Sequence, residues 1–222
     1  MVGLIDGILY SVRRSDRARR VRVRVDVTRG VEVVLPRRAP EREAAAAVRE
    51  LAPWIERRLA EVQRQRSMLA ARGDTLPYLG TTLALVPAPG RQRVVQRDRT
   101  LLVPEGPGRG PALERWCRRM ARLEITPRVE RACAQLDCGY SRLTVRDQRT
   151  RWGSCSRGGA LSFNWRLLLA PEAVLEYVVW HEVCHLRVPD HSPRFWSLLA
   201  AHCPDHRRQV TWLRRNGATL AL

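Results

Sequence analysis

All five histidines of the chain fall within residues 181–206, and two of them flank a glutamate. The segment reads His181-Glu182-Val183-Cys184-His185, an HExxH pattern. On a helix, positions four apart differ by about 40° around the axis, so the two imidazoles share one face and can bind one metal ion. Zinc accepts such ligands, and it makes a bound water acidic enough to attack a carbonyl or phosphoryl centre. Glu182 lies beside the pair, where its carboxylate can accept a proton from that water.

The pattern is specific, because chance gives only about 0.006 matches in a chain of this length and composition. The alternative is an ordinary pair of helix histidines. An apolar stripe on the opposite side of the helix favours the metal site, since the stripe would pack into the core while the histidines line a cleft. The stripe consists of Leu175, Val179, Val183 and Leu186.

A catalytic zinc needs a third protein ligand and an open fourth position. No glutamate follows His185, so a later Glu is excluded as that ligand. We favour His191, because Pro189 ends the helix and lets the chain fold back toward the ion. A closed structural site is disfavoured, because no nearby cysteine spacing fits one. The alternatives for the third ligand are Asp190, His202, Asp205 and His206.

Strands and then a long helix are expected in the first part of the chain. Valines alternate with charged residues over 21–27, which predicts a strand with one buried face. Thr28-Arg29-Gly30 predicts a turn into a second strand at 31–35. A helix is expected over 41–72, where Pro53 splits or kinks it. Further short strands are expected at 79–86, 92–97 and 100–103.

A run of Pro and Gly at 104–111 predicts a linker between two domains. The prediction is an Arg-rich N-terminal region over 1–104 with strands and a long helix, a linker over 105–111, and a second domain over 112–222. The second domain should place the HExxH helix, from Pro171 to about Leu186, beside a small sheet. Its strands are expected at 142–147, 151–156 and 160–165, and its other helices at 112–136, 193–202 and after Asp205. The expected fold class is α+β.

The charge of the chain is strongly positive. All 40 basic residues are Arg, against 22 acidic residues, which gives a formal net charge of +18. The excess lies in the first two thirds of the chain. Arg binds phosphate bidentately, so nucleic acid or a nucleotide is an expected partner. A GC-rich genome would also favour Arg codons, and a solvated Arg-rich surface explains the pattern equally well.

The composition favours a soluble protein of the reducing cytoplasm. Apolar residues make up 45% of the chain, which excludes wholesale disorder. No apolar run reaches the roughly 18 residues of a membrane helix, so no membrane partner is expected. Residues 1–10 lack the basic start of a signal peptide. The six cysteines form no CxxC pair and are too sparse for a disulfide scaffold.

Four segments of the second half resemble the YgjP-like metallopeptidase domain family, a bacterial group related to the SprT-like zincins. They read RDQRTRWGSCS over 146–156, LSFNWR over 161–166, YVVWHEVCHL over 177–186 and DHSPRFW over 190–196. The segments RARRVRVRVD and WIERRL also look like the N-terminal part of that family. The resemblance therefore covers most of the chain.

This resemblance implies that His181, His185 and His191 are zinc ligands and that Glu182 is the general base. It also implies a zincin-like C-terminal domain, in which the active-site helix packs on a small, mainly antiparallel sheet. We therefore expect a zinc-dependent hydrolase, foremost a metallopeptidase acting on a peptide or protein. Two alternatives keep the same metal site: a hydrolase of nucleotide phosphoanhydrides, and a DNA-associated SprT-like protease.

Weaker signals lie around the motif. Arg151 could contact an anionic group or an oxyanion, although Trp152 packing and a close backbone approach at Gly153 explain that segment without chemistry. The strand that ends at Asn164 could pair with an extended peptide. Tyr177 lies one turn before His181 and could reach the metal cleft, or pack in the core. The seven tryptophans are expected to be core anchors.

Overall fold

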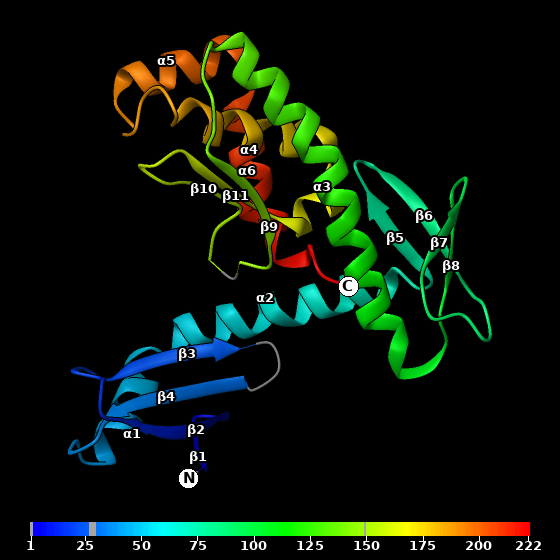
Figure 1. Ribbon diagram of the computed structural model, residues 1–222. Helices are drawn as coiled ribbons and strands as arrows, with labels where there is room; N and C mark the ends of the chain where they lie inside the picture. The colour runs from blue at the N-terminus through cyan, green and yellow to red at the C-terminus, as the bar shows by residue number, and fades with distance from the viewer. Residues whose placement is uncertain (1, 27–29, 149) are drawn as a thin grey trace. The chain divides into compact units, whose positions relative to one another are not determined.

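The computed structural model describes residues 2–26, 30–148 and 150–222 and shows an α+β chain, which confirms the expected fold class. The chain forms two compact units, Met1–Ala71 and Arg72–Leu222 (Figure 1). Each unit has its own hydrophobic core. None of the described helices is long and apolar enough to cross a membrane.

The first unit is a four-stranded sheet with two helices. Its strands are β1 (Val2–Ile5), β2 (Ile8–Ser15), β3 (Arg22–Asp26) and β4 (Gly30–Pro36), in the order β1-β2-β4-β3. The β2–β4 pair is parallel and the other two pairs are antiparallel. Helices α1 (Arg42–Glu50) and α2 (Ala52–Ala71) contact the sheet and share its apolar core.

The antiparallel pairing of β3 with β4 confirms that the two predicted strands pair, whereas Thr28 and Arg29 of the predicted turn lie outside the described residues. The expected long helix is split at Leu51, as predicted, and Pro53 falls in the first turn of the second part, α2. Strands β1 and β2 were not predicted. Asp6 and Gly7, which join them, have φ values of 49° and 78°, the left-handed conformations that a two-residue Asp-Gly hairpin requires.

The second unit begins with another four-stranded sheet. Its strands are β5 (Thr75–Tyr78), β6 (Thr81–Pro87), β7 (Val95–Arg97) and β8 (Thr100–Val103), in the order β5-β6-β8-β7. Strands β6, β7 and β8 lie where strands were expected, whereas β5 was not predicted. Leu83, Leu101 and Val103 on these strands belong to the same buried core as the HExxH helix.

The boundary between the units lies between Ala71 and Arg72 rather than at the predicted linker, residues 105–111. That segment forms a short 3-10 helix, η1 (Gly106–Gly108), and the start of the long helix α3 (Arg109–Gln135). Pro111 falls in the first turn of α3, where a missing amide hydrogen costs no helical bond. The run of Pro and Gly is therefore the start of a helix, and the core continues on both sides of it.

The HExxH helix, α4 (Glu172–Cys184), packs against α3 and against a three-stranded sheet (Figure 1). The sheet contains β9 (Arg142–Arg146), β10 (Gly153–Cys155) and β11 (Ala160–Asn164), in the order β10-β11-β9. The pair β10–β11 is antiparallel, but β11–β9 is parallel, so the sheet is mixed. A 3-10 helix, η2 (Trp165–Leu169), connects the sheet to α4.

Helix α4 is buried almost all round, and its expected apolar stripe is in the core: Leu175, Val179 and Val183 have no exposed surface. Arg128 of α3 fixes the start of α4, since its guanidinium binds Glu172 and Glu176 as well as Glu124. Helices α5 (Pro193–His202) and α6 (His206–Asn216), and a final 3-10 helix, η3 (Gly217–Thr219), complete the unit.

Candidate metal centre

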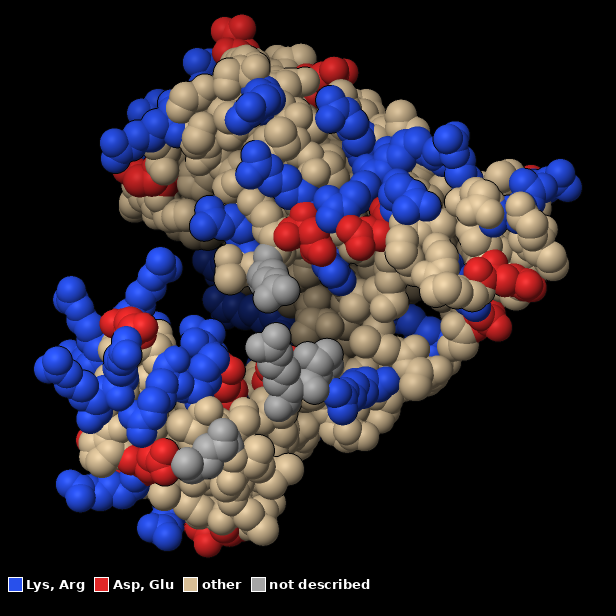
Figure 2. All heavy atoms as spheres, turned by 60° about the horizontal axis from the view of Figure 1, so that its bottom comes forward, with Lys and Arg blue, Asp and Glu red and all other residues tan. Residues whose placement is uncertain are grey.

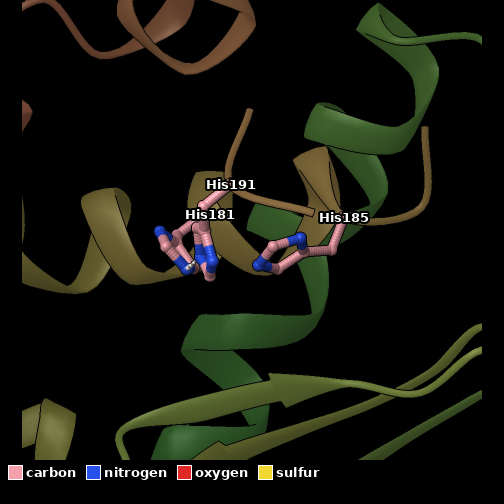
Figure 3. Close-up of side chains that lie close together, drawn as sticks. All are labelled: His181, His185 and His191. Atoms are coloured by element: carbon pink, nitrogen blue, oxygen red, sulfur yellow. Dashed lines mark hydrogen bonds between the residues drawn. The ribbon is translucent and has the colours of Figure 1, made fainter. Parts of the chain in front are cut away.

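The structure brings His181, His185 and His191 together. His181 is in the last turn of α4, His185 caps its end, and His191 follows in the loop before α5 (Figure 3). One ring nitrogen from each residue lies within 4.8 Å of the other two. The Nε2 atoms of His181 and His191 are only 3.1 Å apart. The chain therefore folds back after Pro189, as expected, and carries His191 to the pair.

The chemistry of the three rings fits a divalent ion such as zinc. In a tetrahedral site with Zn–N bonds of about 2.0–2.1 Å, neighbouring ligand atoms lie roughly 3.3 Å apart. The Nδ1 of His185 lies 3.1 Å from the carbonyl oxygen of Val188. If Nδ1 donates its proton there, Nε2 keeps a lone pair for the metal. Burial, and then the charges of the neighbouring histidines, lower the pKa of His181 to about 4, which keeps that ring neutral.

Two aromatic residues at the start of α5 hold the imidazoles. The ring centroid of Phe195 lies 5.0, 4.5 and 4.8 Å from those of His181, His185 and His191. Phe195 has no exposed surface, so it forms the floor of the centre. Trp196 stacks on His191 at 5.6 Å and is 38% exposed. Sequence reasoning missed both contacts, although a helix that starts at Pro193 places its first turn directly beside His191.

Glu182 is buried, with 6% of its surface exposed, between α4 and strand β10. Burial raises the pKa of its carboxyl to about 7, while the charge of Arg151 and the backbone amide of Cys155 oppose that rise. A Cβ on Gly153 would lie 2.6 Å from Cγ and Oε1 of Glu182. The close backbone approach expected at Gly153 is therefore confirmed, and the group that it accommodates is this carboxyl.

The three residues predicted to contact the substrate or the transition state lie in different surroundings. Tyr177 is buried, and its ring lies edge-on to His181 at 5.8 Å. Arg151 is exposed and lines a separate cavity of about 490 Å³. Asn164 is 2% exposed: its amide nitrogen donates to the carbonyl of Gln148 at 2.7 Å, and its oxygen accepts from the backbone amide of Arg166 at 3.0 Å. Asn164 thus holds the loop before β10 and caps η2.

The alternative third ligands have other environments. His202 stacks on Trp180 with ring centroids 4.3 Å apart. The Nδ1 of His206 lies 3.1 Å from the carbonyl oxygen of Cys203, and Asp205 precedes α6. Among the described residues, only His181, His185 and His191 form a group that could hold a metal ion. Of the candidates for the third ligand, His191 is the one that lies with His181 and His185 in this group.

Comparison with known proteins gives one strong match. The sequence profile described as "YgjP-like, metallopeptidase domain" matches residues 19–216. No curated protein gives a significant match to the chain. Among solved structures, the metallopeptidase zymogen jannalysin of Methanocaldococcus jannaschii is 18% identical, with a TM-score of 0.35 over 40% of this chain and 94% of that one. The zymogen abylysin of Pyrococcus abyssi is 21% identical, with a TM-score of 0.36 over 41% of this chain and 96% of that one.

Proposed function

This chain belongs to the YgjP-like metallopeptidase domain family, and on that premise we propose that it is a zinc-dependent peptidase. In this proposal His181, His185 and His191 hold the ion, and Glu182 is the general base. The observation that carries it is the convergence of three ring nitrogens within 4.8 Å of one another, next to a buried carboxyl. Three protein ligands leave a coordination position open, as a catalytic site requires.

A zinc ion held by the three histidines would supply an acidic water and would polarise the carbonyl of the scissile peptide bond. The residues of the chain transfer the proton and position the reacting groups. Glu182 accepts a proton from the attacking water and then delivers it to the leaving amine. The close packing of Gly153 keeps its carboxyl in one place, which matters because catalysis depends on the position of such a group. The bond from His185 to the Val188 carbonyl fixes that imidazole.

Arg151 and Tyr177 are the candidates to contact the substrate. Arg151 is exposed in the neighbouring cavity, and its positive charge opposes the rise in the pKa of Glu182. Tyr177 lies beside His181, where its hydroxyl can donate a hydrogen bond to an oxyanion. Asn164 contributes by positioning, since both ends of its amide already bind backbone groups.

The test compares the purified wild-type protein with Glu182→Gln. We expect one zinc per chain in both proteins, hydrolysis of casein by the wild type, and a loss of about 10²–10⁴-fold in the variant. A chelator should abolish the activity, and added zinc should restore it. Nucleoside triphosphates are assayed in parallel, because the same centre could attack a phosphoanhydride. Hydrolysis of nucleotides alone, or casein hydrolysis that survives Glu182→Gln, would refute the proposal.

A second function, association with nucleic acid, is favoured by the surface of the first unit. Residues 17–24 contain five exposed arginines, and in the described part of the chain none of them forms an ion pair with a carboxylate. Figure 2 shows many basic side chains over this unit. The five are Arg17, Arg19, Arg20, Arg22 and Arg24. Guanidinium groups without carboxylate partners are suited to bind phosphates.

The salt dependence of DNA binding tests this second function. We expect the logarithm of the binding constant to fall linearly with the logarithm of the salt concentration. Each Arg→Gln change in residues 17–24 should lower the slope by about 1. Arg37, which pairs with Asp16, is the matched control site. Binding that is undetectable, or that does not respond to salt, would leave the arginines as a solvated surface.

A further inference from the structure

A pocket of about 580 Å³ lies between α5 and α6. We call it the α5–α6 pocket. Its main lining residues are Trp196 and Ala200 from α5, and His206, Arg207, Val210 and Arg214 from α6. It contains none of the three histidines and no residue to which the proposed mechanism gives a role.

Trp196 connects this pocket to the metal centre. Its ring stacks with two imidazoles, with centroid distances of 5.6 Å to His191 and 5.8 Å to His206 and interplanar angles of 27° and 24°. Trp196 therefore both covers His191 and lines the pocket, so the pocket begins at a side chain of the metal centre.

Helix α6, which carries Arg214, packs against α4, the helix of His181. The pocket thus borders the metal centre through Trp196 at His191 and through the packing of α6 on α4.

The lining combines an apolar wall with two unpaired cations. Trp196, Ala200 and Val210 offer apolar surface, and no acidic residue lines the pocket. Within the described residues, neither Arg207 nor Arg214 forms an ion pair, in contrast to the guanidinium of Arg128, which binds three carboxylates. Such a pocket suits a group with an apolar stem and a carboxylate end, because guanidinium binds carboxylate bidentately.

We infer that the α5–α6 pocket is a substrate subsite that binds a carboxylate-bearing residue next to the scissile bond, with Arg207 and Arg214 as its specificity-determining residues. The carboxylate belongs either to an acidic side chain or to the C-terminus of the substrate. The inference rests on the proposed peptidase function. It is tested first by binding, so that its failure can be distinguished from a failure of catalysis.

The binding test uses the Glu182→Gln protein loaded with zinc, which prevents turnover. Acetyl-Ala-Ala-Glu-Ala-Ala-amide is compared with its Gln counterpart, and acetyl-Ala-Ala-Ala-Leu with a free carboxylate is compared with its amide. Calorimetry should show about tenfold tighter binding of the charged member in at least one pair. Tighter binding of the charged peptide in the first pair would show that the pocket binds an acidic side chain. Tighter binding of the charged peptide in the second pair would show that it binds a C-terminal carboxylate. Equal affinities within both pairs would overturn the inference.

Substitutions then assign the preference to the pocket. Arg207→Gln and Arg214→Gln, each made in the Glu182→Gln protein, should reduce the tenfold preference toward one. Arg208→Gln is the matched control, because Arg208 is an exposed arginine of α6 that does not line the pocket, and it should keep the preference. A preference that persists in both pocket variants, or that disappears equally in the control, would contradict the inference.

The same variants in the active protein give the kinetic readout. The ratio of kcat/KM between the acidic and the neutral peptide should fall with Arg207→Gln and Arg214→Gln and should stay the same with Arg208→Gln. The zinc content is measured in every variant. A protein that binds no zinc would refute the proposed function, whereas one that binds zinc and cleaves both peptides equally would refute only the subsite.

Discussion

Gly153 lies where any side chain would collide with Glu182, since an added Cβ would be 2.6 Å from the Cγ and from the Oε1 of the glutamate. Strand β10, which carries Gly153, is an edge strand that packs on α4. The backbone amide of Cys155 on the same strand also reaches the carboxyl. The position of the proposed base is therefore set by a strand from another part of the sequence, and not by the HExxH motif alone.

Substitution of Gly153 by alanine should displace this carboxyl without touching the three histidines. We expect Gly153→Ala to bind zinc with a normal stoichiometry and to lose about 100-fold in kcat/KM, the cost of a misplacement near 1 Å. Gly158→Ala is the control, because a Cβ there would meet nothing closer than 4.0 Å. Normal activity of Gly153→Ala, or equal losses in both variants, would show that the contact does not position Glu182.

Phe195 should stabilise both the fold and the metal centre, because its buried ring contacts all three imidazoles. Phe195→Ala is expected to lower the free energy of unfolding by about 3–5 kcal/mol in urea titrations. It should also weaken zinc binding by about 10–100-fold, as loss of an outer-shell support does. Leu199→Ala is the comparison, since Leu199 is equally buried on α5 but lies one helical turn beyond Phe195 and carries no aromatic ring to stack on the imidazoles. It should destabilise the protein by about 2–5 kcal/mol while zinc affinity stays near that of the wild type.

The boundary between the compact units predicts which fragment folds. Residues 72–222 contain the whole core that surrounds the HExxH helix, including the sheet β5–β8. This fragment should unfold cooperatively and bind one zinc. A fragment of residues 112–222 would lose that sheet and expose Leu113 and Trp116, so we expect it to aggregate or to lack a cooperative transition. If the two fragments proved equally stable by circular dichroism, residues 72–111 would not belong to this core.

The grouping of the three histidines could be predicted from the sequence because its geometry is mostly local. Two histidines four residues apart share one helix face, and Pro189 ends the helix in time for His191 to return. The contacts of Glu182 with Gly153, and of Trp196 with His206, were not predictable in this way. The first contact joins a helix to a strand that is distant in sequence, and the second forms only after α4, α5 and α6 have packed. Helical and strand periodicity in the sequence does not encode such packing.

The position of the domain boundary also depends on packing between residues that are distant in sequence. The run of Pro and Gly at 104–111 suits a linker, but proline is equally suited to the first turn of a helix. Which structure forms depends on whether the flanking residues share a core, and here Val103 and Ala112 do. Strand pairing is also non-local: the alternation in β3 indicates a strand, but it does not show that β4 also pairs in parallel with β2.

The central claim is that three imidazoles hold one ion on which peptide hydrolysis depends. Titration of the metal-free wild-type protein with zinc, followed by casein hydrolysis at each step, tests it most directly. We predict that activity rises linearly to one equivalent of zinc and then stays constant, and that His191→Ala shows no such rise at stoichiometric zinc. Hydrolysis that is independent of added zinc, or that responds equally in His191→Ala, would contradict the claim.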